Sequence, residues 1–339
     1  MLNAQTPAGL RMLRIACTLG ALPWLLCAAP RDCAAQAKSE TFPSRPLRIV
    51  VPYPPGGGAD ILARIVSQHM SDTFAQPVIT ENRGGAGSMI GIEYVMKAPA
   101  DGYTLLIATT AFVINPTLYK KVNYAPLRDF APVSLGIRFP YLLVVHPSLP
   151  VKTVTDLIAL AKTRPGQITF ASSGTGQANH LAGEMFKDAA GIDLLHVPYK
   201  GGGPVLTDMM GGQVSMTFGT VLQTLPQVRA GRLRGLAVSS AKRVSFAADL
   251  PTIAEAALLG FEAIGWYSFA VTTGTPAAAA AKLNQEVVRI LGLPAVKERL
   301  LELGTEPHPS SIEEAQRFYA SELARWSQVV LRAGLKGSE

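Results

Sequence analysis

The feature that most constrains the fold is a strand, a glycine-rich loop and a helix start that follow one another without a break. The segment reads Ile49-Val-Val-Pro-Tyr-Pro-Pro-Gly-Gly-Gly-Ala-Asp60. Its apolar beginning predicts a buried strand that Pro54 and Pro55 end, and apolar residues at helical spacing over 61–70 predict a helix from near Ala59. Glycines let backbone N–H groups approach a ligand closely, and a helix N-terminus adds free donors and the positive end of its dipole. The segment therefore predicts an anion-binding loop.

The same plan recurs twice further along the chain. A strand at 167–171 leads into the loop 172–176, a short strand at 196–199 leads into the loop 200–204, and a helix follows each loop. Around the first loop, strands at 47–51, 78–80 and 103–108 alternate with helices, which calls for a parallel sheet with right-handed crossovers. Ligands of such sheets bind at the carboxyl ends of the strands. We therefore expect an α/β protein with two parallel-sheet lobes that present Gly, Ser and Thr loops to one cleft.

The last third of the chain has no further strand–loop–helix segment. An aromatic-rich strand at 266–272 is followed by helices that start near Pro276, Pro294 and Ser311, where Ser311 and Glu314 have the spacing of a capping box. We expect these elements to pack on the sheet formed first. The predicted organisation is then a first lobe of 38–145 plus 266–339 and a second lobe of 146–265.

The N-terminal 37 residues have the pattern of a secretory signal peptide. Two arginines precede an apolar stretch, and Ala35-Gln-Ala37 is a small-x-small cleavage pattern. A membrane anchor is the alternative, but the apolar run is shorter than the ~20 residues that a spanning helix needs. All three cysteines, Cys17, Cys27 and Cys33, lie inside this segment. We therefore expect a mature protein in the periplasm with no thiol and no disulfide.

The net charge of +7 falls to about +5 without residues 1–37, and the basic residues are scattered rather than clustered. No basic run carries interleaved aromatic residues, so nucleic acid is not an expected partner. A mild positive charge suits a small anion.

Enzyme patterns do not fit this sequence. In the Gly-x-Gly-x-x-Gly dinucleotide fingerprint, the third glycine position is Ile61 when counted from Gly56 and Asn179 when counted from Gly174. There is no Gly-x-Ser-x-Gly nucleophile segment, and by spacing no histidine pairs with a second histidine or an acid as metal ligands do. We expect no catalytic residue, no cofactor and no metal, with a secreted enzyme as the remaining alternative.

The candidate ligand-binding residues lie in the loops at the predicted strand ends. Each of these residues could instead have a purely structural role. The glycines could form turns, and the hydroxyl groups could cap helices. Asp60 could be a first-turn carboxylate that complements the helix dipole, and Tyr199 could be a core or hinge aromatic. The set comprises Tyr53, Pro55, Gly56, Gly57, Gly58, Asp60, Thr109, Thr110, Ser172, Ser173, Gly174, Thr175, Tyr199, Lys200 and Thr220.

An ordered set of motifs resembles the substrate-binding receptors of tripartite tricarboxylate transporters, also called Bug receptors. The motifs run through the whole mature chain: Arg48 to Asp60, Glu81-Asn-Arg-Gly-Gly-Ala-Gly87, Asp101-Gly-Tyr-Thr-Leu105, Asp129-Phe-Ala-Pro-Val133, Ala171-Ser-Ser-Gly174 with His180-Leu-Ala182, His196-Val-Pro-Tyr-Lys-Gly201, Leu236-Ala-Val-Ser239 and Pro251-Thr252. The sequence departs from the family at Gly84, where proline is usual.

The resemblance implies a type 2 periplasmic-binding (Venus flytrap) fold that delivers a small carboxylate to membrane carrier subunits, most simply as a monomer. It implies that the loops Pro55–Gly58 and Ser172–Thr175 hold the ligand carboxylate between the two lobes. A receptor that signals to a membrane sensor instead of feeding transport stays open. The distal part of the pocket would choose the ligand, and Phe112, Tyr141, Phe218 and Trp266 are candidates for it.

Overall fold

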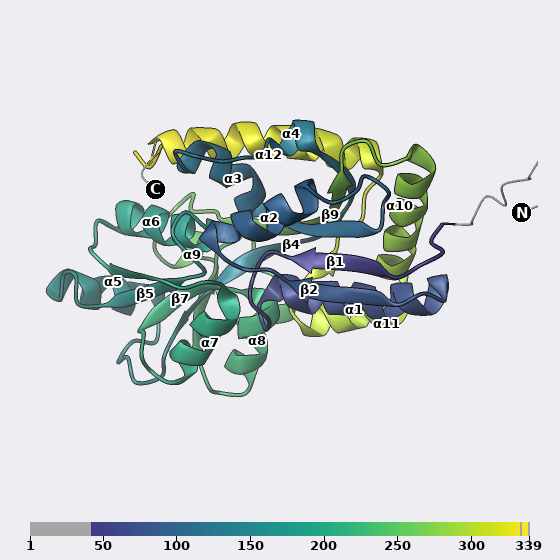
Figure 1. The fold of residues 1–339 in the computed structure, drawn as a ribbon. Helices are drawn as coiled ribbons and strands as arrows, with labels where there is room; N and C mark the ends of the chain where they lie inside the picture. The colour runs from purple at the N-terminus through teal and green to yellow at the C-terminus, as the bar shows by residue number, and fades with distance from the viewer. Residues whose placement is uncertain (1–41, 333, 338–339) are drawn as a thin grey trace, which may run out of the picture. The chain divides into compact units, whose positions relative to one another are not determined.

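The computed structural model describes residues 42–332 and 334–337, and the predicted signal peptide lies outside these residues. No helix in the described ranges is long and apolar enough to span a membrane. Two sheets that share one strand organise this part of the chain (Figure 1).

The first sheet has the order β2-β1-β3-β9-β4. β1 (Leu47–Val51) pairs in parallel with β2 (Val78–Asn82) and β3 (Thr104–Thr109). α1 (Gly58–Phe74) and α2 (Met89–Met96) make the crossovers, so the predicted βαβαβ unit is confirmed. β9 (Ile264–Thr272) is antiparallel to β3, which makes the sheet mixed.

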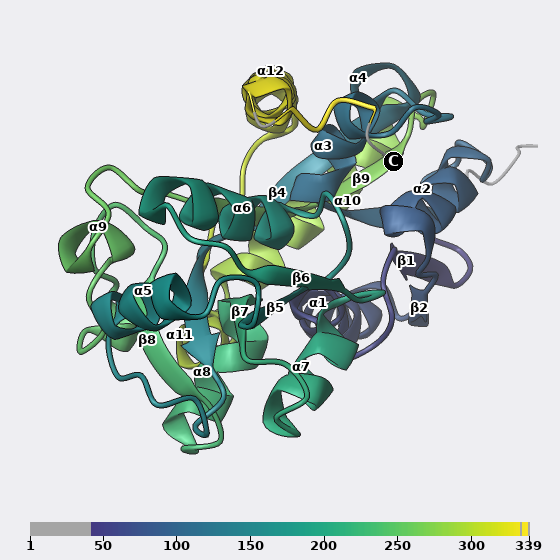
Figure 2. The ribbon, with the colours of Figure 1, turned by 90° about the vertical axis from the view of Figure 1, so that its left-hand side faces the viewer.

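The second sheet has the order β6-β5-β7-β4, with β8 (Arg234–Val238) on the other side of β4. β5 (Thr169–Ser172) is parallel to β6 (Leu195–Pro198) and β7 (Met216–Thr220). Figure 2 shows α6 (Ala178–Ala190) and α7 (Gly202–Met210) on opposite sides of these strands. α5 (Val154–Thr163), α8 (Val221–Arg229) and α9 (Ile253–Ala256) complete this region.

The shared strand is β4 (Phe130–Val145), which is 16 residues long. Its first part, Phe130–Pro140, pairs with β9, and its last part, Tyr141–Val145, pairs with β7 and β8. The prolines at 132 and 140 argue locally against a continuous strand through this segment. The register of the β4–β9 pairing shifts beside Pro132 and again between Leu135 and Ile137, so the strand passes the first proline as a bulged ladder.

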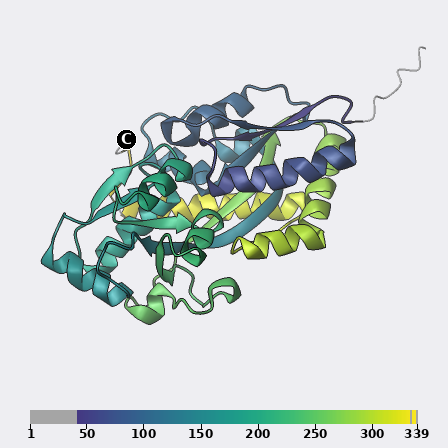
Figure 3. The same cartoon turned by 90° about the horizontal axis from the view of Figure 1, so that it is seen from below.

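The last third of the chain packs on the first sheet. α10 (Ala277–Gly292) lies beside α1, as Figure 3 shows, and α11 (Pro294–Glu302) and β10 (Glu306–Pro307) follow it. α12 (Ile312–Arg332) contacts β4, α3 (Thr110–Leu118) and the short α4 (Pro126–Asp129). The predicted capping box is confirmed, since Ser311 Oγ accepts from the Glu314 N–H at 3.1 Å and the Glu314 carboxylate accepts from the Ser311 N–H at 2.9 Å.

The helices that the sequence analysis missed include two that start directly after a strand. α3 starts at Thr110 directly after β3, and α8 starts at Val221 directly after β7, with no loop between strand and helix. Each contains a proline, Pro116 and Pro226, which argues against a helix interior. Both helices begin at the edge where the two sheets meet.

Candidate functional site

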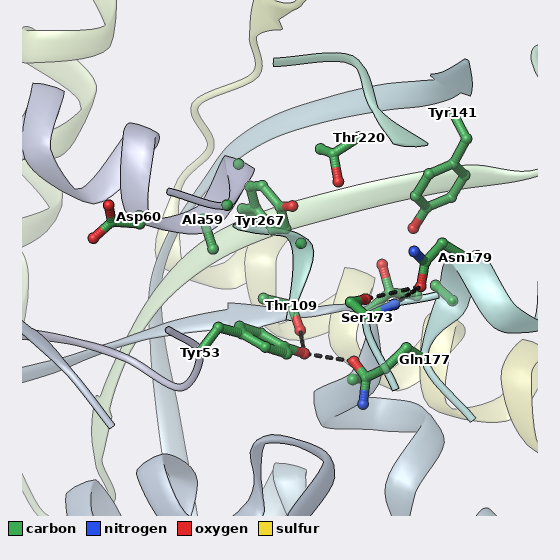
Figure 4. Close-up of a pocket in the computed structure, with 16 residues that line it drawn as sticks. Tyr53, Ala59, Asp60, Thr109, Tyr141, Ser173, Gln177, Asn179, Thr220 and Tyr267 are labelled. Carbon is green, nitrogen blue, oxygen red and sulfur yellow. Dashed lines mark hydrogen bonds between the residues drawn. The ribbon is translucent and has the colours of Figure 1, made fainter. Parts of the chain in front are cut away.

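A cavity of about 50 Å³ lies at the carboxyl ends of β1, β3, β5 and β7, where the two sheets approach one another (Figure 4). Both sheets contribute to it. It is lined by Tyr53, Gly57, Gly58, Ala59, Asp60, Thr109, Thr110, Ala111, Tyr141, Ser173, Gln177, Ala178, Asn179, Gly202, Thr220 and Tyr267. We call it the inner cavity.

Five helices begin at the inner cavity: α1, α3, α6, α7 and α8. Each contributes its N-cap residue, a first-turn residue or both to the lining. Among the described residues, none of these five N-termini has a side-chain cap hydrogen bond. The first N–H groups of a helix have no partner within the helix, and the helix dipole favours negative charge there. The cavity is therefore built to receive an anion.

Asp60 holds the glycine loop rather than facing the cavity centre. Its carboxylate accepts hydrogen bonds from the Gly56 N–H at 3.0 Å, from Asn82 Nδ2 at 2.9 Å and from Arg64 Nε at 3.0 Å. Figure 4 shows the carboxylate turned away from Thr109 and Tyr53. Burial alone would raise the pKa of Asp60, but the hydrogen bonds outweigh it and lower the pKa below its ordinary value. Asp60 is thus a charged anchor of the loop that precedes α1.

The Tyr53 hydroxyl crosses from the first sheet to the second. It lies 3.0 Å from Thr109 Oγ1 and donates to Gln177 Oε1 at 2.6 Å (Figure 4). Burial raises the pKa of Tyr53 to about 12, so the phenol keeps its proton at neutral pH.

The opposite wall of the inner cavity carries Tyr141, Tyr267 and Asn179, each more than nine-tenths buried. Burial raises the pKa of both tyrosines well above the ordinary range. Asn179 Oδ1 accepts from the Ser173 hydroxyl at 2.8 Å, which fixes the amide beside the loop 172–176. The side chains of this wall are uncharged, so an anion would be held there by dipoles and hydroxyl groups.

A second cavity of about 330 Å³ lies next to the inner one. We call it the outer cavity. It is lined by Tyr53, Gly85, Ala86, Gly87, Ser88, Met89, Tyr119, Ser173, Gly174, Thr175, Pro198, Tyr199 and Lys200. The Tyr119 hydroxyl donates to the Thr175 carbonyl at 3.2 Å across it.

The structure brings most of the predicted site residues to these two cavities. The inner cavity takes Tyr53, Gly57, Gly58, Asp60, Thr109, Thr110, Ser173 and Thr220, and the outer cavity takes Tyr53, Ser173, Gly174, Thr175, Tyr199 and Lys200.

Three predicted site residues line neither cavity. Pro55 and Gly56 pack against Gly203, where an added Cβ would lie 2.3 Å from the Pro55 carbonyl oxygen. Ser172 is fully buried, with its hydroxyl 2.7 Å from His196 Nε2 and 3.0 Å from the Gly174 carbonyl.

In the lining of the inner cavity, the sequence analysis missed Gln177, Asn179, Gly202 and Tyr267, together with three alanines at helix starts. The position of Gln177 and Asn179 could have indicated them, because both stand at the first helical turn after a strand and its loop. Of the four candidates for the distal pocket, Tyr141 lines the inner cavity, whereas Phe112, Phe218 and Trp266 lie in the core.

Two histidines support the loop 172–176 from behind, and the fold pairs them although their sequence spacing did not suggest it. The rings of His180 and His196 stack with centroids 4.0 Å apart, and His180 Nδ1 accepts from the Gly176 N–H at 3.0 Å. His180 Nε2 lies 3.6 Å from the Glu184 carboxylate one turn further along α6. Burial and the neighbouring His180 lower the pKa of His196 to about 4. Within the described ranges, no group of three or more His, Cys, Asp or Glu residues is placed to hold a metal.

Comparisons with known proteins show that the chain matches a known family over most of its length. The family model of the tripartite tricarboxylate transporter family receptors matches residues 62–335. The protein BugT of Bordetella pertussis is 35% identical over 305 residues, covering 89% of this chain and 94% of BugT.

Two solved structures have the same fold. Rpa4515 of R. palustris, solved with adipate, superposes with a TM-score of 0.84 at 39% identity, covering 86% of this chain and 98% of that one. MatC of Rhodopseudomonas palustris, solved with malate, gives 0.81 at 30% identity, covering 85% and 100%. The periplasmic-binding fold expected from the sequence is confirmed, and the chain belongs to the receptor family of tripartite tricarboxylate transporters.

Proposed function

We propose that this protein captures a small organic carboxylate between two lobes and delivers it to the membrane carrier subunits of a tripartite tricarboxylate transporter. The observation that carries the proposal is the convergence of five uncapped helix N-termini on one cavity. A carboxylate placed there accepts hydrogen bonds from backbone N–H groups of helices that follow strands of both sheets. Charge-assisted hydrogen bonds of this kind are about twice as strong as neutral ones. Relatives that were solved with adipate and with malate support the choice of carboxylates.

We propose the lobe boundaries that the sequence suggested, with 38–145 plus 266–339 as the first lobe and 146–265 as the second. β4 passes from one sheet to the other near Pro140 and Tyr141. The return crossing is held by the Ala263 N–H, which donates to the Ser239 carbonyl at 2.8 Å. Two crossings of this kind form a hinge about which the lobes can close over a solute.

The proposed ligand contacts are of two kinds. In the inner cavity, the carboxylate meets Gly57, Gly58, Thr109, Thr110, Ser173 and Thr220. In the outer cavity, the remainder of the ligand faces Gly174, Thr175, Tyr199 and Lys200. Asp60 keeps the loop of Pro55 and Gly56 in place without touching the ligand. Binding needs no nucleophile, no cofactor and no metal. The expected site of action is the periplasm, where the protein acts as a monomer after cleavage of residues 1–37.

Thermal melting of the mature protein against a panel of mono- and dicarboxylates tests the proposal. A ligand at ~100 times its Kd stabilises the folded state by about 2.7 kcal/mol, which is a measurable rise in Tm. A rise with one class of carboxylate supports the receptor function. No response from protein shown to be free of co-purified ligand argues against it, and turnover of a bound acid would identify an enzyme instead.

A further inference from the structure

The two cavities share one boundary. Tyr53 and Ser173 line both of them, whereas Gln177 lines only the inner cavity and Gly87 only the outer one. The Tyr53 side chain ends at this boundary, where its hydroxyl meets Thr109 and Gln177.

Gln177 uses both ends of its side-chain amide on the opposite half of the molecule. Its Oε1 accepts from the Tyr53 hydroxyl at 2.6 Å, and its Nε2 donates to the Gly87 carbonyl at 3.1 Å. The side chain is 3% exposed, and although Gln177 is the N-cap residue of α6, it makes no cap bond to that helix. The amide therefore bridges the cleft along the line that separates the cavities.

The sizes of the cavities give this bridge a consequence. The inner cavity measures about 50 Å³, and ligand pockets for larger molecules usually measure about 300–1,000 Å³. The outer cavity, at about 330 Å³, lies within that range. A ligand with its carboxylate at the five helix starts and a chain longer than the inner cavity must extend past Tyr53 and Gln177.

We propose that the Tyr53–Gln177 hydrogen bond is a length filter for the ligand, and this proposal rests on the proposed function. A short acid fits the inner cavity and leaves the bond intact, so the bond stabilises the closed form around it. A longer acid reaches the outer cavity only when the bond is broken. Gln177 and Tyr53 are then specificity-determining residues that set the preferred chain length.

The test is the binding of an unbranched dicarboxylate series, malonate, succinate, glutarate and adipate, to the mature protein by calorimetry. The variants are Tyr53→Phe and Gln177→Ala. Tyr103→Phe is the matched control, because its hydroxyl also has hydrogen-bond partners, at Ser44, but Tyr103 lines neither cavity.

The readout is the ratio of Kd for adipate to Kd for malonate. Both site variants should lower this ratio by about threefold to tenfold, the range that one hydrogen bond supplies, and Tyr103→Phe should leave it unchanged. An equal ratio in all four proteins overturns the length filter while leaving the receptor function in place. Absence of binding of any acid in the series, or of any carboxylate in the panel, by all four proteins overturns the proposed function and the filter with it.

Discussion

The helices of this molecule begin in two different ways. α5, α9 and α12 start with capping boxes at Thr153, Thr252 and Ser311. In each box, the N-cap hydroxyl accepts from the N–H of the third helical residue, and the carboxylate of that residue accepts from the N-cap N–H. α1, α3, α6, α7 and α8 start at the inner cavity with no side-chain cap among the described residues. An N–H group that a capping side chain already occupies is not available to a ligand. Three helices that start away from the cavity thus use side-chain caps, whereas the five that start at it have none.

A missing cap alone does not mark the site. α10 and α11 also lack a side-chain cap bond, yet they start beside Pro276 and Pro294 and line neither cavity. What distinguishes the other five is that they converge from two sheets on one point. The comparison is therefore tested best by changes that affect one group of helix starts and spare the other.

The largest effect is expected from Gly58→Ala. A Cβ at Gly58 would lie 2.7 Å from Thr220 Cγ2 and 3.0 Å from the Tyr267 hydroxyl, so the methyl group fills the space above the start of α1. We expect carboxylate affinity to fall by more than about tenfold, since both ligand space and lobe closure are affected. Calorimetric titration measures it.

Gly57→Ala is the comparison for that prediction, because alanine keeps the backbone N–H of residue 57, the group through which we propose it meets the carboxylate. A Cβ at Gly57 would have no neighbour closer than 3.8 Å, and its φ of −82° suits any residue. If both alanine variants bound carboxylates as tightly as the wild type, the start of α1 would not be a ligand contact.

The next effect is expected from Asp60→Asn. The amide cannot accept all three hydrogen bonds that the carboxylate accepts, and it loses the ion pair with Arg64. We expect a loss of about 1–3 kcal/mol in the free energy of unfolding and weaker binding of every acid, measured by urea unfolding and titration. If only ligands with an amino group lost affinity, Asp60 would be a ligand contact instead of a loop anchor.

Two threonine variants compare the two groups of helices directly. Thr153→Ala removes the cap of α5 and should lower stability by about 1 kcal/mol without changing affinity. Thr220→Ala, at the start of α8, has no cap bond to lose and should weaken binding several-fold with a smaller loss of stability. Urea unfolding and titration of both variants check this, and the same pattern in both would remove the distinction between the groups.

The smallest effect concerns pH and the loop that leads to α6. The pKa of His196 is about 4 in the folded protein against an ordinary value of 6.5, so the unfolded chain binds a proton that the folded one does not. The contribution of His196 to the free energy of unfolding should therefore be fully present above pH 6.5 and decrease as the pH drops toward 4.

Melting curves between pH 7.5 and 5 measure this effect. Because the His196 ring is partly exposed, we expect His196→Gln to reduce the fall in Tm by only about 2 °C. Burial also lowers the pKa of His308, so part of the fall in Tm with pH remains in the variant. If Tm fell with pH as steeply in His196→Gln as in the wild type, His196 would already be solvated in the folded protein.

The sequence predicted the elements whose local signals agree with the fold. The glycine loop before α1 and the loop 172–176 were located because strand, small residues and helix follow in order. α3 and α8 were not predicted, since Pro116 and Pro226 argue locally against helices that packing stabilises. Gln177 and Tyr267 were not predicted because their role depends on two sheets meeting, which no local pattern encodes. His180 and His196 are 16 positions apart, on α6 and β6, and only the packing of α6 on the second sheet brings them together.

The shared strand β4 also has a consequence for how the chain folds. Phe130 pairs with Thr272 and Arg138 with Glu306, so the first sheet joins segments more than 130 positions apart. Contacts at such separation carry a high loop-closure cost and slow folding. Until β9 has been added, β3 keeps an open edge of the kind that promotes aggregation. A chain cut before Ile264 should therefore not yield an independently stable first sheet, and assembly of the two sheets should be one cooperative event.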